Sequence, residues 1–83
     1  MATKREELEK LARGEGALAN AADDEEIFIL VAHDRLAAET VCDWIDRARH
    51  AHVEIAKVMK ARQVAERMAM WQSRNRERVK VPD

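Results

Sequence analysis

The sequence has few of the residues that interrupt helices or cross-link small folds. Its 83 residues include two glycines, one proline and one cysteine. An all-β fold needs many turn residues, so this composition argues against one. The single cysteine, Cys42, excludes an internal disulfide. Its place beside the apolar side of an expected helix predicts a buried or half-buried thiol.

Long apolar runs are missing as well. The chain has no stretch of about 18 apolar residues, which argues against a membrane-spanning helix. Its N-terminus is charged and lacks the apolar core of a signal peptide. We therefore expect the protein in a reducing cytoplasm, with no membrane as its partner.

Motifs for phosphate binding, metal binding and catalysis are also absent. Gly14 and Gly16 are not followed by the Lys-Ser/Thr pair of a phosphate-binding loop. His50 and His52 are two residues apart, so they lack the i, i+4 spacing of a helical metal site. The remaining reactive side chains are His33, Asp34 and Cys42. None has a partner at an informative spacing, so we predict no catalytic residue, no cofactor, no metal and no enzymatic activity.

The residues that are present favour helices. Hydrophobic residues make up 47% and charged residues 37% of the chain, and helix-forming residue types are prominent. We predict an all-α fold, a small bundle of three to four helices with one long C-terminal helix. An N-terminal helix and flexible joint are expected over residues 1–22, and a helical core domain with a basic C-terminal tail over residues 23–83. A domain this small has a thin core, which favours a homodimer.

Residues 33–49 form the clearest amphipathic helix. Six of their apolar side chains fall within an arc of about 120° on a helical wheel. They are Ala37, Ala38, Val41, Trp44, Ile45 and Ala48. Asp34 is placed to cap this helix. The alternative is a start after Ala37, with Leu36 and Val41 as a hydrophobic staple.

The N-terminal region carries the signals of a first helix. Thr3 and Glu6 have the spacing of a capping box. Gly14 is placed to end the helix that they begin. Residues 15–22 are then expected to form a flexible joint.

Residues 27–32, with the sequence IFILVA, are the most apolar run, and their secondary structure is ambiguous. Their β-branched residues favour a strand, for which residues 79–81 or a second copy are the candidate partners. The acidic residues 23–26 suit a helix N-terminus and favour a short buried helix, which is the interpretation we prefer. In either form the run is too apolar to face water, so we expect it in the core or in an interface.

Residues 53–76 form the longest expected helix, and it has two apolar faces. The first face comprises Val53, Val64, Met68 and Trp71, within an arc of about 60°, with Ala61 and Ala65 beside it. We expect it to pack on the central helix, with Trp71 near Trp44. The second face comprises Ile55, Met59 and Met70. It would be covered by a partner or, equally, by the N-terminal helix and residues 27–32.

Charge is unevenly distributed, although the net charge is −1. Residues 1–46 contain 5 Lys/Arg and 12 Asp/Glu, whereas residues 47–80 contain 10 and 3. We expect the acidic half to pack against the basic half, within one chain or across a dimer. The alternative is a basic surface for nucleic acid or for an acidic partner. No aromatic residue is interleaved in the basic tail, so base stacking is not supported.

A set of core and turn positions in the second part of the chain forms a pattern. It comprises residues 27–30, 34–37, 40, 41, 44, 61, 65–68, 71, 72, 79 and 81–83. This pattern resembles that of short uncharacterised proteins encoded in phages and prophages of Proteobacteria. Ala38 departs from it, because such sequences often have proline there. The resemblance implies a mobile-element setting inside a bacterial cell, and no reaction or binding residues.

We therefore expect a small non-enzymatic phage-type protein that binds another protein of the phage or its host. Inhibition of a host enzyme or defence complex is one form of this function. The expected partner-binding residues are Ile55, Met59, Met70, Arg74, Arg76 and Arg78. The alternative is a nucleic-acid-binding accessory protein that uses the basic C-terminal half, which includes Lys57, Lys60, Arg62 and Arg67. The acidic first half argues against that alternative.

Overall fold

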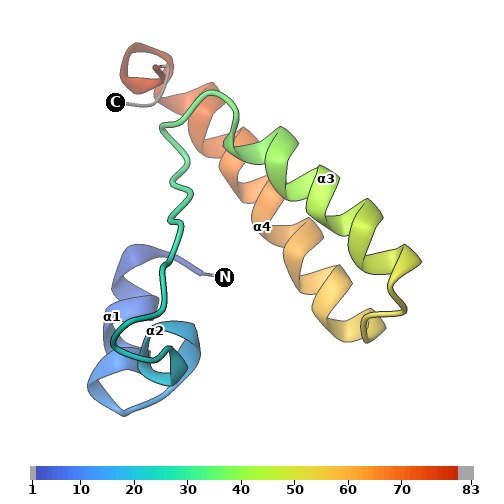
Figure 1. Ribbon diagram of the computed structural model, residues 1–83. Helices are drawn as coiled ribbons and strands as arrows, with labels where there is room; N and C mark the ends of the chain where they lie inside the picture. Colours follow the sequence, from blue (N-terminus) through green and yellow to red (C-terminus); the bar gives the residue numbers. More distant parts are fainter. Residues whose placement is uncertain (1, 81–83) are drawn as a thin grey trace.

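The helices of the chain pack in two pairs that are joined by a long open connection (Figure 1). The computed structural model describes residues 2–80. Its helices are α1 (Lys4–Ala12), α2 (Gly16–Asn20), α3 (Ala37–His50), α4 (Ile55–Arg74) and the 3₁₀ helix η1 (Arg76–Arg78). α1 packs on α2, and α3 packs on α4. The prediction of a small all-α bundle with one long C-terminal helix is confirmed.

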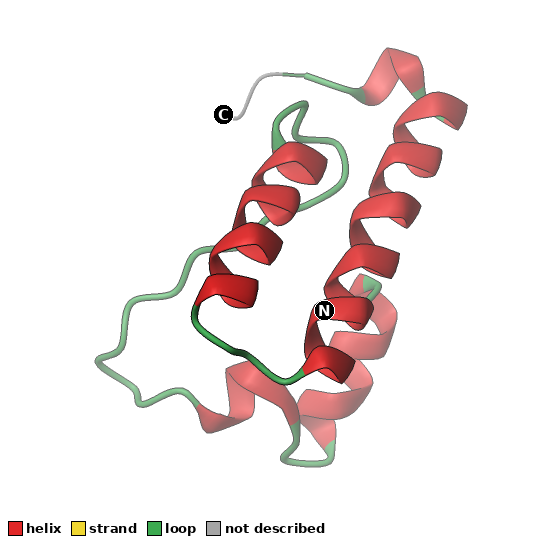
Figure 2. Ribbon diagram, turned by 90° about the vertical axis from the view of Figure 1, so that its right-hand side faces the viewer, coloured by secondary structure: helices red, strands yellow, loops and turns green. Residues whose placement is uncertain are grey.

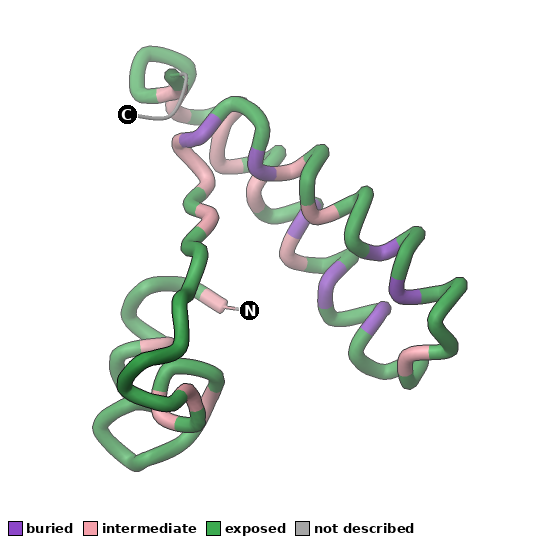
Figure 3. The backbone as a smooth tube through the Cα atoms, viewed as in Figure 1, coloured by how far each residue is buried: buried purple, intermediate pink, exposed green. Residues whose placement is uncertain are grey.

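The hydrophobic core lies between α3 and α4. Its buried apolar residues are Ala37, Ile45, Ala48, Val58, Ala61 and Ala65. Half-buried Val41 and Val53 pack against this cluster. Alanine predominates, so the two helices approach closely but remove little apolar area from water. Figure 3 shows buried residues on these helices and in the turn before α3, and α1 and α2 contain none.

The buried side chains of α4 are centred about 90° around the helix axis from the predicted face. Ala61 and Ala65 lie at the centre of the buried side, whereas the helical wheel had placed them beside the main apolar arc. Val58 is buried although the prediction omitted it, and Val64 is only half-buried. The reason is that small side chains allow the closest approach, so the alanines and not the larger residues define the contact line.

The two tryptophans do not share a layer, so that prediction is wrong. Trp44 lies in the middle of α3 and is 42% exposed. Trp71 lies near the end of the helix pair at which α3 begins, because the next residue, Gln72, donates hydrogen bonds to the backbone just before α3. In an antiparallel pair the end of α4 faces the start of α3, which separates Trp71 from Trp44.

Local hydrogen bonds explain where α3 begins and ends. It begins at Ala37, and Asp34 acts from a preceding turn, where its Oδ1 accepts the Leu36 N–H at 2.8 Å. It ends in a Schellman motif, in which Val53 N–H bonds to the Ala48 carbonyl at 2.9 Å. His52 occupies the left-handed position of this motif, with φ +57°. Residues 51–54 therefore join the two helices.

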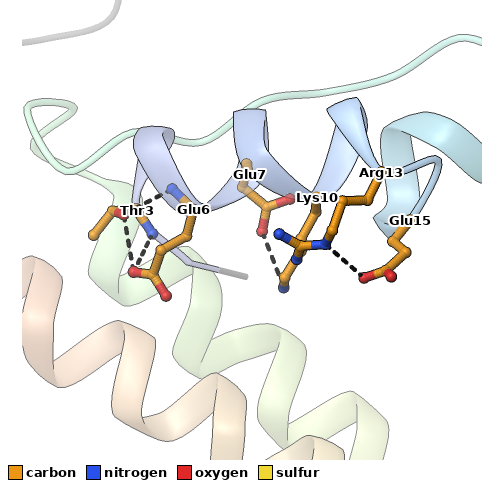
Figure 4. Close-up of polar contacts among 6 residues, drawn as sticks. All are labelled: Thr3, Glu6, Glu7, Lys10, Arg13 and Glu15. Atoms are coloured by element: carbon orange, nitrogen blue, oxygen red, sulfur yellow. Dashed lines mark hydrogen bonds and ion pairs between the residues drawn. The ribbon is translucent and has the colours of Figure 1, made fainter.

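The predicted ends of α1 are confirmed. Thr3 and Glu6 form the capping box, and the Thr3 side chain accepts the Glu6 N–H at 3.2 Å (Figure 4). Gly14 has φ +71° and reverses the chain after the helix. Residues 15–22, which were expected to form a flexible joint, instead contain α2, because the chain turns back at the two glycines and packs on α1.

The preferred helix over residues 27–32 is wrong, and no strand forms there either. The acidic residues before the run form a turn, in which the Glu25 side chain accepts the Ala22 N–H at 3.1 Å. The predicted strand partner meets the chain only beyond the run, as an isolated parallel bridge between Asp34 and Lys80. Val81 of that partner lies outside the described residues. Among the described residues, the β-branched run therefore has no partner strand.

We predict that His52→Gly stabilises the helix pair. A side chain in the left-handed conformation is strained, and glycine removes the strain at a smaller entropic cost. The free energy of unfolding should rise by about 0.5–1 kcal/mol in denaturant titrations. His50→Gly is the matched control, because His50 is helical and glycine there should lower stability. Destabilisation by both variants would contradict this account of the turn.

Candidate interaction surface

Large apolar side chains remain exposed over much of the molecule. The most exposed are Phe28 at 84%, Ile55 at 75% and Ile29 at 66%. The chain has an accessible surface of 6949 Å², whereas a folded monomer of this mass is expected to have about 5,000 Å². Its Cα radius of gyration is 13.7 Å, against about 11.8 Å expected for this length. The helix pairs therefore leave apolar surface that the chain does not bury.

Residues 27–31, here called the apolar segment, are the most exposed part of this surface. Within the described part of the chain, the backbone groups of residues 27–30 form no hydrogen bond. Their side chains also face water, since Ile27 is 55% exposed and only Leu30 is half-buried. Of the two expected places for this run, the core is therefore wrong, and an interface stays a prediction. The apolar segment offers both unpaired backbone and apolar side chains to a partner.

Hydrogen bonds hold both ends of the apolar segment. At its start, the Glu25 N–H bonds back to the Ala22 carbonyl at 3.1 Å. At its end, Gln72 Nε2 donates to the carbonyls of Ala32 and Asp34, both at 2.9 Å. The segment is thus anchored to α4 while its centre stays free. Anchoring reduces the conformational entropy that a partner must remove when it binds.

The parallel bridge adds a second anchor at the same place. The Lys80 N–H donates to the His33 carbonyl, and the Arg35 N–H donates to the Lys80 carbonyl, both at 3.0 Å. Gln72 and Lys80 follow the segment by some forty residues or more, so the C-terminal part of the chain fixes the exit of the apolar segment into α3.

The second predicted surface lies on α4 and is also exposed. Ile55 and Met59 are one helical turn apart and are 75% and 59% exposed. Met70 is 53% exposed but lies about 16 Å further along the helix, with Glu66 on the same side between them. The alternative, in which α1 and residues 27–32 cover this face, is wrong. The face is two separate patches, of which Ile55 with Met59 is the larger.

The predicted arginines lie at the other end of α4. Arg74 is its last residue, and Arg76 and Arg78 bound η1. The Arg78 guanidinium stacks over the Trp71 ring, 5.1 Å from its centroid, in a cation–π contact. The structure therefore brings the arginines near Met70 and not near Ile55 and Met59, so the six predicted residues do not form one site.

Acidic and basic halves of the chain are not paired by ion pairs in the described residues. The ion pairs found there are local: Lys10 with Glu7 at 3.7 Å and Arg13 with Glu15 at 3.4 Å (Figure 4). Hydrogen bonds from Thr3 lower the pKa of Glu6, with a smaller contribution from the positive charge of Arg67. The two halves do pack on one another within the chain, because most of α3 belongs to residues 1–46 and packs on α4, but this contact is made by apolar side chains and not by ion pairs among the described residues.

Reactive side chains do not assemble into a chemical site in the described part of the chain. Cys42 was expected to be buried or half-buried, but it is exposed. It lies on the side of α3 that does not contact α4. No group of three potential metal ligands occurs among residues 2–80. Asp34 is buried, but its carboxylate serves the turn before α3. None of the described helices is long and apolar enough to cross a bilayer.

Comparisons with known proteins give no family. No protein-family model matches the chain, and neither a curated protein nor a solved structure does. The resemblance to prophage-encoded proteins stays a prediction. The exposed surface is therefore the feature from which a function is inferred.

The apolar segment was not among the predicted partner-binding residues. Phe28, its most exposed member, lies in a run that was expected to be helical. The signal was present in the sequence as consecutive apolar residues, several of them β-branched, directly after four acidic residues. Such a run is too short for a stable buried helix, and among the described residues it has no strand partner, so its apolar side chains remain exposed.

We predict that Gln72→Met loosens the apolar segment. Methionine has a similar shape but cannot donate, so the carbonyls of Ala32 and Asp34 lose their partner, at a cost of about 1–2 kcal/mol. Amide hydrogen exchange at Arg35 and Leu36 should then become roughly tenfold faster.

Gln63→Met is the matched control for this variant. Gln63 lies on the same helix, is exposed and has no hydrogen-bond partner among the described residues. Exchange at Arg35 and Leu36 should stay unchanged in the control. Equal rates in both variants would show that the Gln72 bonds do not hold the segment.

Proposed function

We propose that this chain is a non-enzymatic binding module that acts by associating with other polypeptides, including a second copy of itself. The supporting observation is its surface of 6949 Å², roughly 1,900 Å² more than a folded monomer of its mass needs. Each partner in a standard protein–protein complex buries about 800 Å². The excess therefore suffices for a standard interface, and for more than one.

The two exposed surfaces suit different modes of binding. The apolar segment presents backbone N–H and C=O groups, so it fits a partner that adds a strand. The α4 patch of Ile55 and Met59 presents side chains from a rigid helix, which fits packing against an apolar surface of another protein. Methionine is flexible and polarisable, so Met59 and Met70 adapt to an uneven partner surface.

A bacterial protein is the proposed partner of the α4 patch, in keeping with the resemblance to prophage-encoded proteins. A module of this kind acts by occupying a surface that its target needs for another contact. Inhibition of a host enzyme or defence complex is the form of this function that we propose. It requires no catalytic group in the module itself.

We predict that Met59→Lys with Met70→Lys abolishes association with such a partner. Both side chains are more than half exposed, so the substitutions leave the helix pair folded but place charge where apolar contact is needed. Tagged wild type and variant are expressed in bacteria, and the proteins that co-purify with each are quantified by mass spectrometry. Proteins that bind through the Met59 and Met70 side of α4 should no longer co-purify with the variant, while its far-UV circular dichroism stays unchanged.

Thr40→Lys with Ala51→Lys is the control. Both positions are exposed and lie in α3 or directly after it, so this variant adds the same charge away from the α4 face and keeps every large apolar side chain. It should retain the partners. If the methionine variant keeps the same partners as wild type, the α4 face does not bind them and the proposal loses its support.

Nucleic-acid binding is the second candidate, and one observation favours it. Lys60, Arg67 and Arg74 are seven residues apart on one side of α4, and all are exposed. Within the described residues none of them forms an ion pair. Such a stripe can contact phosphates without changing the fold.

Salt dependence tests this candidate. If the stripe binds phosphates, association with duplex DNA or with RNA should be measurable at about 50 mM salt and weaken steeply by about 200 mM. Arg67→Gln should reduce the salt slope by about one unit. The absence of binding at about 50 mM salt would remove the nucleic-acid candidate and leave protein binding untouched.

A further inference from the structure

We propose that the apolar segment pairs with the same segment of a second copy, as two antiparallel strands with Ile29 on the two-fold axis. This inference rests on the proposed function and names the partner of one of its surfaces. It leaves the α4 patch to a different protein.

Access and backbone chemistry support this pairing. The backbone groups of residues 27–30 are unpaired in the described structure, and three of the five residues of the segment are β-branched. The connection that carries the segment bows outward from the helices, as Figure 2 shows. A second strand can therefore approach it, and both chains gain a ladder of hydrogen bonds while covering their exposed side chains.

The order of charges along the chain selects the antiparallel direction. Four acidic residues, 23–26, precede the apolar segment, and His33, Asp34 and Arg35 follow it; of these, Asp34 is buried and accepts the Leu36 N–H. Antiparallel strands place the acidic residues of each copy beside the His33–Arg35 turn of the other. Parallel strands would place the acidic residues of both copies side by side, which is destabilising. The side chains of Asp23 and Arg35 then come opposite one another when the strands are centred on Ile29.

The same centring gives the largest apolar overlap. Ile27 of one copy lies opposite Val31 of the other, so that every residue of the segment has an apolar neighbour. Residues 27, 29 and 31 share one face of the two-stranded ribbon, and residues 28 and 30 share the other. A shift of one or two residues along the strand would expose apolar side chains and bring acidic side chains into the ribbon.

The acidic residues also decide between a protein and a nucleic acid as the occupant. A two-stranded ribbon of this size fits the major groove of DNA. Residues 23–26 add four negative charges next to each strand, and the strands themselves carry no basic side chain. Phosphate repulsion therefore disfavours DNA, and a second copy, whose Arg35 lies opposite Asp23, is the better match.

Site-directed cross-linking tests the pairing and its register. In the full chain, Cys42→Ser removes the exposed native thiol, and Ile29→Cys, Ile27→Cys or Val31→Cys is added singly. Across an antiparallel pair centred on residue 29, the two Cα atoms of residue 29 lie about 5 Å apart, within disulfide range, whereas those of residue 27 lie about 14 Å apart. Disulfide dimers formed in glutathione buffer are then quantified on non-reducing gels.

Ile29→Cys should cross-link on the order of tenfold faster than Ile27→Cys or Val31→Cys, because its two thiols are held together in the dimer. An equal mixture of Ile27→Cys and Val31→Cys should cross-link as a mixed pair at a similarly high rate. Fast cross-linking of every variant alone would show parallel pairing and overturn the proposal. Slow cross-linking of all variants and of the mixture would show that the segments do not pair.

This outcome is separable from the proposed function. If the segments do not pair but the Met59→Lys, Met70→Lys variant still loses its partners, protein binding stands and only the self-pairing is wrong. If the segments pair and no partner depends on α4, the chain is a dimer and the proposed binding of another protein fails.

Discussion

The packing of α3 on α4 through alanine is the constraint on which the rest of the structure depends. Alanines such as Ala61, which is fully buried, let the helices approach closely. They also keep the core small, since Ile45 and Val58 are its only larger buried apolar residues among those described. Burying a larger aliphatic side chain contributes about 1.5–3 kcal/mol, so a core with two of them is thin.

A thin core has a direct consequence for the other apolar residues. They exceed what the helix pair can cover, and α1 with α2 packs apart from α3 and α4. The remaining apolar surface is therefore spread over the molecule, and its most exposed side chains lie on the apolar segment and on the outer side of α4. Gln72 connects these features, because it lies on α4 and fixes the end of the segment through the Ala32 and Asp34 carbonyls. The same helix, α4, therefore forms half of the core and holds the end of the exposed apolar segment.

Local signals in the sequence predicted the helices well. Thr3 with Glu6 predicted the capping box, Gly14 predicted the end of α1, and the apolar arc predicted the buried side of α3. Each of these depends on residues within a few positions of one another. The hydrogen-bond partners that they need are supplied by their own helix.

Long-range features were not predictable in the same way. Trp44 and Trp71 have the right periodicity to meet, but the register of the antiparallel helices separates them. Residues 27–32 have no local signal that distinguishes a buried helix from an uncovered strand. Their conformation depends on Gln72 and Lys80, some forty residues or more away, and on whether a partner is present.

Sedimentation equilibrium of the unmodified chain tests the central claim, that the surface left by this thin core is covered by association. The account predicts a molar mass of twice 9.5 kDa at high concentration, which falls toward 9.5 kDa on dilution. A mass of 9.5 kDa across the whole concentration range, together with no bacterial protein bound to the chain after incubation with bacterial extract, would contradict it.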